Sequence, residues 1–409
     1  MTRRSPHRRV VVLGAGLAGA RLAARLGPDA LLIGEEPHAP YNRVLLTDVL
    51  AGRYGPEVIA LPRPPRGGYL RTRAVRLDLA DRVVLCEDGS RVPYGTLVLA
   101  TGANPVLPPL RGLFAPGAPD LPDGVHPFRT MADCLALSAA AGPGARAVVV
   151  GGGLLGVCAA RALADRGAQV VLAQQGDRLM ERQLDPDASE LVRAHLTALG
   201  VEVHTECRVR GVRQHDGAVR AVELADGCLL DTDLTVLACG VRPRTGLARA
   251  AGLEVRRGVV VDDRLRTSDP HVYAVGDCAE HAGLTRCLAA PALDQADALA
   301  AALTSPETAR PYSGTRSLTR LTLPHGEHPL DLAAFGDPET RPDDDVVRLT
   351  DATRGTYRKV VVRDDRLVGG VLLGELASVG ALARAWESDE PLPDDGSPLL
   401  HLLTHDGGL

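Results

Sequence analysis

The chain has 409 residues, a length that predicts two to four domains at ~100–200 residues per domain. Hydrophobic residues make up 45% and charged residues 24%, which is typical of a globular protein with an ample core. The net charge is −5 and no basic block stands out. We therefore expect neither nucleic acid nor an anionic membrane as the main partner.

The eight cysteines contain no C-x-x-C pair, which argues against a redox disulfide, an iron–sulfur cluster and a zinc site. Scattered thiols suit a reducing cytoplasm, so we expect a cytoplasmic protein without a metal site. Arginines before the apolar stretch Val10–Ala20 superficially resemble a secretory signal. Three regularly spaced glycines within that stretch favour a strand, a turn and a helix instead. No run approaches the ~18 uncharged apolar residues of a membrane span.

The first informative pattern is a βαβ unit near the N-terminus. Val10–Leu13 predicts a strand, Ala18–Leu26 a helix and Ala30–Ile33 a second strand. Between the first two stands Gly14-Ala15-Gly16-Leu17-Ala18-Gly19, a G-x-G-x-x-G turn that lets the backbone approach a pyrophosphate. Glu35 follows about 20 residues after Gly14, where an acidic residue binds a ribose. The sequence therefore predicts a dinucleotide site here.

The same unit occurs a second time. The expected strand Ala147–Val150 runs into Gly151-Gly152-Gly153-Leu154-Leu155-Gly156, a helix to Arg166 and the strand Gln169–Ala173. Two copies so far apart predict two nucleotide-binding domains rather than a solenoid.

The second unit lacks the acidic residue at the end of its second strand. Gln174 stands there, with Arg178 four residues later. A missing carboxylate removes repulsion against a 2′-phosphate, and an arginine could pair with one. We therefore expect NADPH to be slightly favoured over NADH, with both usable. The alternative for Arg178 is a solvated helix face.

Other expected elements follow the same alternation of strands and helices. Strands are predicted at Arg82–Cys86, Leu97–Ala100, Val201–His204, Ala218–Leu224, Leu234–Ala238 and Val272–Val275, with a helix at Ala292–Leu303 and a linker at 104–124. Beyond residue 305, strands at Val346–Leu349, Lys359–Val362 and Leu367–Leu373 and a helix around Ala377–Trp386 predict a separate α+β domain. The residues from Pro391 are expected to be loose.

Two glycine turns, Thr101-Gly102 at a strand end between them and a late Gly276-Asp277 together resemble the flavoprotein reductases with two dinucleotide-binding domains. The resemblance implies an α/β fold with two Rossmann-like domains, one for FAD and one for NAD(P), and a small C-terminal α+β domain. It implies a discontinuous FAD-binding domain at 8–115 and 245–305, an NAD(P)-binding domain at 116–244 and a C-terminal interface domain at 306–409.

The resemblance narrows on Tyr41-Asn42-Arg43-Val44, Gly240–Arg244 and Tyr357-Arg358-Lys359. These segments are similar to the flavin module of the assimilatory nitrite reductase large subunit and to rubredoxin and putidaredoxin reductases. By position, the resemblance implies cofactor contacts at Gly14, Gly16, Leu17, Ala18, Gly19, Glu35, Glu36, Arg43, Ala74, Thr101, Gly102, Arg129, Gly151, Gly153, Leu154, Leu155, Gly156, Gln174, Arg178, Gly240, Gly276, Asp277, Pro291 and Ala292. Oxygenase-type relatives pair a lysine with a glutamate near the flavin, and here Asp48 and Cys158 stand at those positions.

The resemblance implies an FAD-dependent NAD(P)H oxidoreductase with FAD and either NADPH or NADH as cofactors. Because the chain has no dithiol and no siroheme-binding half, we expect electrons to pass to a separate acceptor. That acceptor would be a ferredoxin, a rubredoxin or a nitrite-reductase-like subunit. The sequence is compatible with a homodimer and does not fix the oligomeric state. Two alternatives stay open: a freestanding flavin oxidase or reductase of a small molecule or natural-product intermediate, and a nucleotide-bound sensor without turnover.

Overall fold

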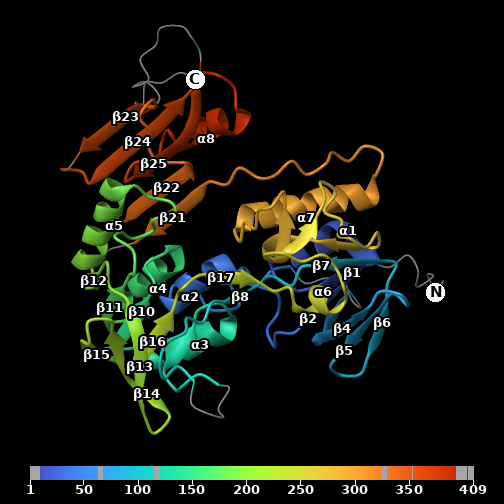
Figure 1. The fold of residues 1–409 in the computed structure, drawn as a ribbon, viewed down its shortest axis with the longest axis horizontal. Coiled ribbons are helices and arrows are strands. Elements are labelled where there is room, and N and C mark those ends of the chain that lie inside the picture. The colour runs from blue at the N-terminus through green and yellow to red at the C-terminus, as the bar shows by residue number, and fades with distance from the viewer. Residues whose placement is uncertain are drawn as a thin grey trace.

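The computed structural model describes residues 10–62, 68–114, 120–324, 329–351, 353–392 and 403. Two parallel five-stranded sheets and one antiparallel five-stranded sheet form three bodies (Figure 1). The arginines before Val10 and most of the segment after Pro391 lie outside the described residues. In the described part of the chain, no helix has the length and apolar character needed to cross a membrane.

The first parallel sheet has the strand order β19-β7-β1-β2-β3. Its strands are β1 (Val10–Leu13), β2 (Ala30–Gly34), β3 (Tyr69–Arg71), β7 (Thr96–Leu99) and β19 (Val272–Ala274). Leu13 pairs with both Ile33 and Leu99, so three strands reach the same edge of the sheet at their carboxyl ends. In parallel α/β sheets this edge is where ligands bind. Helices α1 (Leu17–Leu26) and α7 (Ala289–Thr304) lie side by side over the sheet (Figure 1).

Smaller elements complete this first body. They are α6 (Gly246–Ala250), the antiparallel sheet β4 (Ala74–Asp78), β5 (Val83–Cys86) and β6 (Arg91–Pro93), and the parallel pair β18 (Val259–Val261) and β20 (Ala279–His281). The short helix α2 (Leu46–Leu50), although it follows β2 in the chain, packs into the hydrophobic core of the second body. The three middle strands of the parallel sheet, β1, β2 and β7, are apolar and almost wholly buried, as parallel strands covered by helices require.

The second parallel sheet has the order β12-β11-β10-β16-β9. Its strands are β9 (Val125–Pro127), β10 (Arg146–Val150), β11 (Gln169–Ala173), β12 (Glu202–His204) and β16 (Leu234–Leu237), and its helices are α3 (Met131–Ala140), α4 (Leu154–Asp165) and α5 (Pro186–Ala198). An antiparallel sheet of β13 (Val209–His215), β14 (Ala218–Leu224) and β15 (Leu229–Asp231) extends it.

The chain crosses between the two parallel sheets twice, and the crossings pair with each other. β8 (Ala103–Pro105) and β17 (Val241–Pro243) form a two-stranded antiparallel ribbon. Beyond β8, the Arg111 backbone N–H donates to the Arg210 carbonyl at 3.0 Å, and Leu113 is buried against β13. The segment after Pro105 therefore packs on the second body, and the expected boundary at residue 115 lies beyond this crossover.

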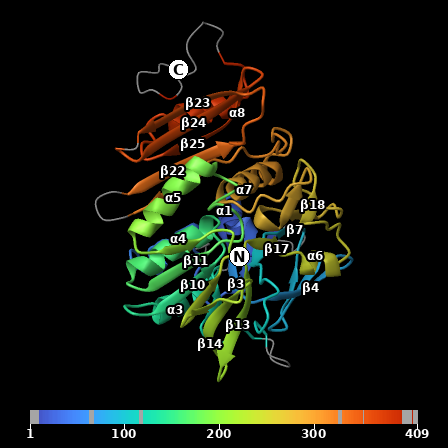
Figure 2. The ribbon, with the colours of Figure 1, turned by 60° about the vertical axis from the view of Figure 1, so that its left-hand side comes forward.

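The C-terminal body is an antiparallel sheet with the order β21-β22-β25-β24-β23. It consists of β21 (Thr319–Leu323), β22 (Leu330–Gly336), β23 (Asp345–Asp351), β24 (Thr356–Arg363), β25 (Arg366–Leu373) and α8 (Val379–Ser388). Trp386 of α8 packs on Phe335 from one face. The other face lies toward α5, and Tyr357 and Leu373 join the hydrophobic core of the second body (Figures 1 and 2).

The expected fold class is confirmed, and most expected strands lie within one or two residues of the observed ones. The start of the long helix was predicted too late: α7 begins at Ala289, and Pro291 lies in its first turn. A proline is tolerated there because first-turn N–H groups have no partner within the helix. Among the elements that the sequence interpretation missed are α3, α5, β13, β21 and β22.

Candidate cofactor-binding sites

The turn between β1 and α1 leaves no room for side chains at two of its glycines. A Cβ atom on Gly14 would lie 2.0 Å from the Ala100 carbonyl oxygen, and one on Gly19 would lie 1.9 Å from the Gly14 carbonyl oxygen. At Gly16 the nearest atom to such a Cβ is Nε of Arg43, 3.8 Å away. The backbone is therefore packed tightly behind the turn and open in front of Gly16, as a pyrophosphate site requires.

The turn between β10 and α4 repeats this geometry. A Cβ atom on Gly151 would lie 2.6 Å from the Ala238 carbonyl oxygen, and one on Gly156 would lie 1.8 Å from the Gly151 carbonyl oxygen. A Cβ atom on Gly153 would have nothing within 4 Å. In both turns, therefore, the first and last glycines of the motif are packed against backbone atoms, and the middle glycine has open space beside it.

The helices that follow the two turns begin without a side-chain cap. Among the described residues, no side chain caps α1 at Gly16 or α4 at Gly153, and neither helix has an acidic residue in its first turn. By contrast, Thr130 caps α3 and Asp185 caps α5. The first-turn positions Leu17, Ala18, Leu154 and Leu155 therefore present backbone N–H groups at the positive end of a helix dipole, which is suited to a pyrophosphate.

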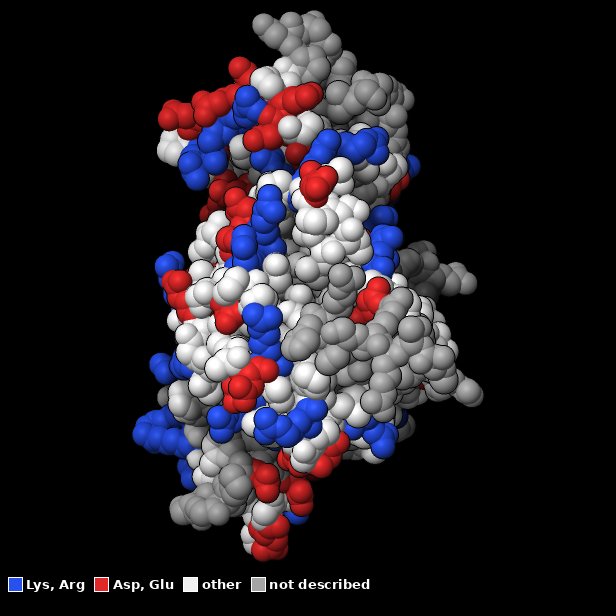
Figure 3. All heavy atoms as spheres, turned by 90° about the vertical axis from the view of Figure 1, so that its right-hand side faces the viewer, with Lys and Arg blue, Asp and Glu red and all other residues white. Residues whose placement is uncertain are grey.

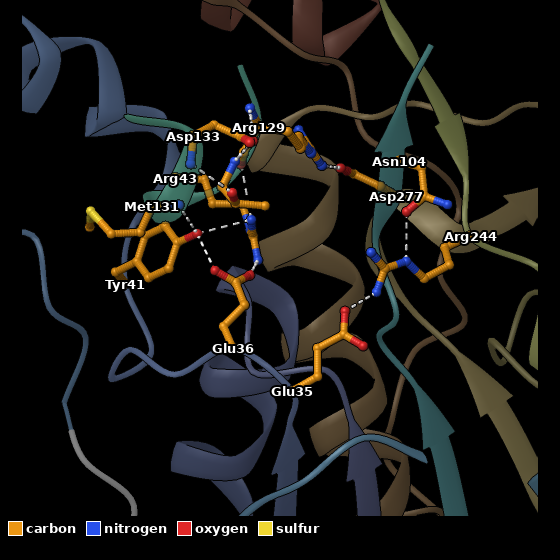
Figure 4. Close-up of polar contacts among 11 residues, drawn as sticks. Glu35, Glu36, Tyr41, Arg43, Asn104, Arg129, Met131, Asp133, Arg244 and Asp277 are labelled. Atoms are coloured by element: carbon orange, nitrogen blue, oxygen red, sulfur yellow. Dashed lines mark hydrogen bonds and ion pairs between the residues drawn. The ribbon is translucent and has the colours of Figure 1, made fainter. Parts of the chain in front are cut away.

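Arg43 is held in front of the first turn by a partly buried polar cluster (Figure 4). Its guanidinium forms an ion pair with Glu36 and donates to the Arg129 carbonyl at 3.0 Å. The Tyr41 hydroxyl donates to the other Glu36 oxygen at 2.6 Å and accepts from the Met131 backbone N–H at 2.9 Å. Burial raises the pKa of Tyr41, so the hydroxyl stays protonated. Glu36 therefore positions Arg43, and Tyr41 is a supporting residue that the sequence interpretation did not assign.

Asp277 reaches the same region from the far end of the chain. It forms a 2.5 Å ion pair with Arg129, and the neighbouring Gly276 N–H donates to the Gln295 side chain at 2.7 Å. A Cβ atom on Gly276 would lie 3.1 Å from the Ala18 Cβ and 3.7 Å from the Ala292 Cβ. The Gly276-Asp277 turn, the start of α1 and the first turn of α7, with Pro291, are thus brought together.

Glu35 lies just after β2, where a ribose-binding acid is expected. Its carboxylate forms an ion pair with Arg244 and lies 3.8 Å from Nε of Arg73 (Figure 4). Arg244 also donates to the Asn104 side chain at 2.8 Å, and its carbonyl accepts from the Thr101 hydroxyl at 2.8 Å. An ion-paired carboxylate retains acceptor sites for ribose hydroxyls. Arg244 belongs to the segment Gly240–Arg244, which contributes to the family resemblance, but its pairing with Glu35 was not predicted from the sequence.

Three other predicted positions lie at strand ends. Gly102 follows Thr101 with φ +70°, and Gly240 has φ +93° and accepts from the Val106 N–H at 2.9 Å, so both form the ends of the connecting ribbon. Ala74 begins β4 and packs on the core of the first body. Among the contacts of the described residues, none joins Ala74 to the Arg43 cluster.

At the second turn, Gln174 is buried and its Oε1 accepts from the Gly152 backbone N–H at 2.7 Å. Arg178 does not stand free beside it. Arg178 forms ion pairs with Asp177 at 3.3 Å and with Glu339 of the C-terminal sheet at 2.8 Å.

Asp48 and Cys158, which stand where oxygenase-type relatives have a lysine and a glutamate, do not pair with each other. Asp48 of α2 forms an ion pair with Arg53 at 3.3 Å and lies 3.8 Å from the Arg161 guanidinium on α4. Cys158 is buried one turn before Arg161, and burial raises its pKa to about 12. The thiol is therefore a packed, protonated side chain, while Asp48 and Arg161 join the two helices.

Comparison with known proteins agrees with this geometry. Residues 8–298 match the family described as pyridine nucleotide-disulphide oxidoreductase, and residues 329–390 match the rubredoxin NAD+ reductase C-terminal domain. The chain belongs to the pyridine nucleotide-disulphide oxidoreductase family. It is 32% identical to the ferredoxin–NAD(+) reductase component of the biphenyl dioxygenase system of Paraburkholderia xenovorans, over 96% of this chain and 98% of that protein.

Two other relatives extend the comparison. The chain is 33% identical to nitrite reductase [NAD(P)H] of Bacillus subtilis, over 90% of this chain and 46% of that protein, so it spans about half the length of this relative. The solved ferredoxin reductase for the CYP199A2 system of Rhodopseudomonas palustris superposes with a TM-score of 0.82 at 28% identity, covering 96% of this chain and 98% of that one.

Membership of this family confirms the prediction of an oxidoreductase with FAD and NAD(P)H as cofactors. The residues present fit both groups, because each glycine turn is open at its second or third glycine and leads into an uncapped helix. Which residues touch each cofactor, and which nicotinamide nucleotide is used, stay predictions.

Proposed function

We propose that the chain is an electron-transfer reductase, which takes electrons from NAD(P)H and passes them by way of FAD to a separate redox protein. The observation that carries this is the pair of matching glycine turns, at Gly14–Gly19 and Gly151–Gly156, each at the carboxyl end of its own parallel sheet. FAD would lie on the first turn, and the nicotinamide nucleotide on the second.

In this proposal, the chain's own residues bind FAD and orient it. The N–H groups at the start of α1 would hold the FAD pyrophosphate, with Arg43 beside them as a fixed positive charge. Glu35 would accept from a ribose, and Asp277 from the ribityl chain, with Arg129 keeping Asp277 in place. FAD, when bound, supplies the hydride-accepting and electron-donating chemistry, so the protein contributes orientation rather than an acid or base.

We propose the division expected from the resemblance with one change, that the first boundary lies at the crossover and not at residue 115: the FAD-binding domain comprises 8–105 and 245–305, the NAD(P)-binding domain 106–244 and the C-terminal domain 306–409. The pairing of β8 with β17 supports this division, because these two strands are the points where the chain passes between the first two domains. The cysteines are all free, which supports a cytoplasmic location.

The acceptor is proposed to be a small iron–sulfur carrier, of the kind named in the relatives that are ferredoxin and rubredoxin reductases. The sequence has no C-x-x-C pair that could relay electrons within the chain. On the face in Figure 3, acidic and basic side chains are interspersed without a continuous patch of one sign. The charge on this face therefore does not single out one carrier, and the experiment must compare several.

The test is anaerobic reduction of the purified yellow protein by NADH and NADPH, followed by turnover with ferricyanide, ferredoxin, rubredoxin and oxygen. We expect rapid bleaching of the flavin band and strong stimulation by one of the carrier proteins, with weak turnover on oxygen. Turnover on oxygen alone as fast as with any carrier would contradict the proposal and support a freestanding oxidase. Failure of both nucleotides to bleach the flavin would support a sensor.

A further inference from the structure

A carboxylate from outside β11 lies at the place where the ribose-binding acid is missing. Just beyond the strand, a Cβ atom on Gly176 would lie 2.3 Å from Oε2 of Glu181 and 2.9 Å from Nε2 of Gln174. The Glu181 carboxylate and the Gln174 amide therefore converge on one point at the end of β11. In a dinucleotide-binding unit, this strand end faces the adenosine ribose.

The backbone fixes Glu181 relative to the glycine turn. The Met180 N–H donates to the Gly152 carbonyl at 2.8 Å, and the Leu179 N–H donates to the Ser189 hydroxyl at 2.9 Å. Because Met180 is hydrogen-bonded directly to the glycine turn, the backbone of the next residue, Glu181, is held close to that turn. Among the described residues, no arginine or lysine forms an ion pair with Glu181, so its negative charge is available to a ligand.

The nearby arginine is compensated by two carboxylates. Arg178 pairs with Asp177 and with Glu339, and its Nε donates to the Leu184 carbonyl at 3.3 Å. Glu339 comes from the segment after β22, so the C-terminal domain neutralises the charge that could have received a 2′-phosphate.

We propose that Glu181 is a specificity-determining residue that supplies the carboxylate missing from β11, so that the site takes NADH rather than NADPH. A carboxylate accepts from ribose hydroxyls and repels a 2′-phosphate across a short distance. This reverses the slight preference for NADPH expected from Gln174 and Arg178 alone. The inference rests on the proposed nucleotide site at the second glycine turn.

The test is calorimetric binding of NAD+ and NADP+ to the oxidised, FAD-loaded protein, which requires no turnover. We expect the wild-type protein to bind NAD+ at least about tenfold more tightly than NADP+. Glu181→Gln should reduce this ratio about tenfold, mainly by strengthening NADP+, because one Coulombic repulsion near the surface is removed. Gln174→Glu should increase the ratio, because it keeps an acceptor for the Gly152 N–H and adds a second carboxylate.

The matched control is Glu190→Gln, which removes one negative charge from α5, where Glu190 is paired with Arg193. It should leave the ratio unchanged. Tighter binding of NADP+ by the wild-type protein, or equal ratios in Glu181→Gln and Glu190→Gln, would overturn the inference. A shift with Glu339→Gln but none with Glu181→Gln would also overturn it, in favour of Arg178. Absence of binding by either nucleotide would instead contradict the proposed function.

Discussion

Lys359, the only lysine of the chain, forms a 2.9 Å ion pair with Asp185, and their side chains are only 4% and 6% exposed. The Tyr357 hydroxyl donates to the same Asp185 oxygen at 2.6 Å, and Lys359 also donates to the Pro338 carbonyl at 2.8 Å. Since Asp185 caps α5 and Lys359 belongs to β24, this contact joins the second body to the C-terminal body.

Lys359→Met should destabilise this junction by about 3–5 kcal/mol, because it leaves a buried carboxylate without its counter-charge. The measurement is chemical denaturation followed by the fluorescence of Trp386, the only tryptophan, which is buried in the C-terminal domain. Arg348→Gln is the control, since the Arg348–Asp187 pair links the same domains but is about half exposed, and it should cost ~1 kcal/mol or less. Equal losses in the two variants would contradict this prediction.

The junction should also weaken in acid. Burial acts to raise the pKa of Asp185, but hydrogen bonds from Tyr357, Lys359 and the Ala188 N–H outweigh it and hold the pKa below its usual value. A carboxyl whose folded pKa lies below the unfolded value of ~3.9 stabilises the fold above that pH, and the stabilisation is lost as pH falls through the folded pKa. The difference in unfolding free energy between wild type and Asp185→Asn should therefore shrink from pH 6 to pH 3. A difference that grows in acid would refute this assignment.

Gly16→Glu and Gly153→Glu should separate the two cofactor sites. A side chain at either position meets open space and an extended backbone, so the fold should tolerate both changes. The carboxylate would occupy the pyrophosphate position at the start of the helix. We expect Gly16→Glu to lose FAD, measured in the supernatant after heat release, and Gly153→Glu to retain FAD but lose flavin reduction by NAD(P)H. Loss of FAD from both proteins at once would mean that the sites are misassigned.

Thiol labelling should distinguish the cysteines by burial. Cys228 is exposed, whereas Cys158 and Cys134 are buried, and burial raises their pKa to about 12 and about 11. Iodoacetamide at pH 8 should therefore modify Cys228 first, as detected by peptide mass spectrometry, because the thiolate is the reactive form. Cys158→Ala should leave flavin reduction by NAD(P)H unchanged, since the thiol is a packing group. A large loss in a variant with normal FAD content would show a role in the reaction.

The local parts of the sites were predictable from the sequence. The spacing of Gly14, Gly16 and Gly19 requires a particular backbone turn, and the turn has the expected close contacts. Glu35 was placed correctly at a strand end by its distance along the chain. Periodicity located most strands because buried β-branched runs are distinct.

Contacts between distant segments were not predictable. Arg244 meets Glu35 only because the ribbon returns the chain to the first sheet. Glu181 lies beside Gln174 only because its loop folds back onto Gly152, and no spacing rule describes such a loop. The absence of an acid at Gln174 could be read from the sequence, but its replacement required the tertiary structure.

The ribbon of β8 and β17 bears on whether the domain between these strands can be replaced. Val241 pairs with Pro105 and Pro243 with Ala103, so the chain leaves and re-enters the first sheet at neighbouring points. The domain between them is attached as an insertion with adjacent ends, a geometry in which domain insertion and circular permutation are tolerated. Another domain joined at these two strands should thus be exchangeable for the one between them, while the first parallel sheet stays intact.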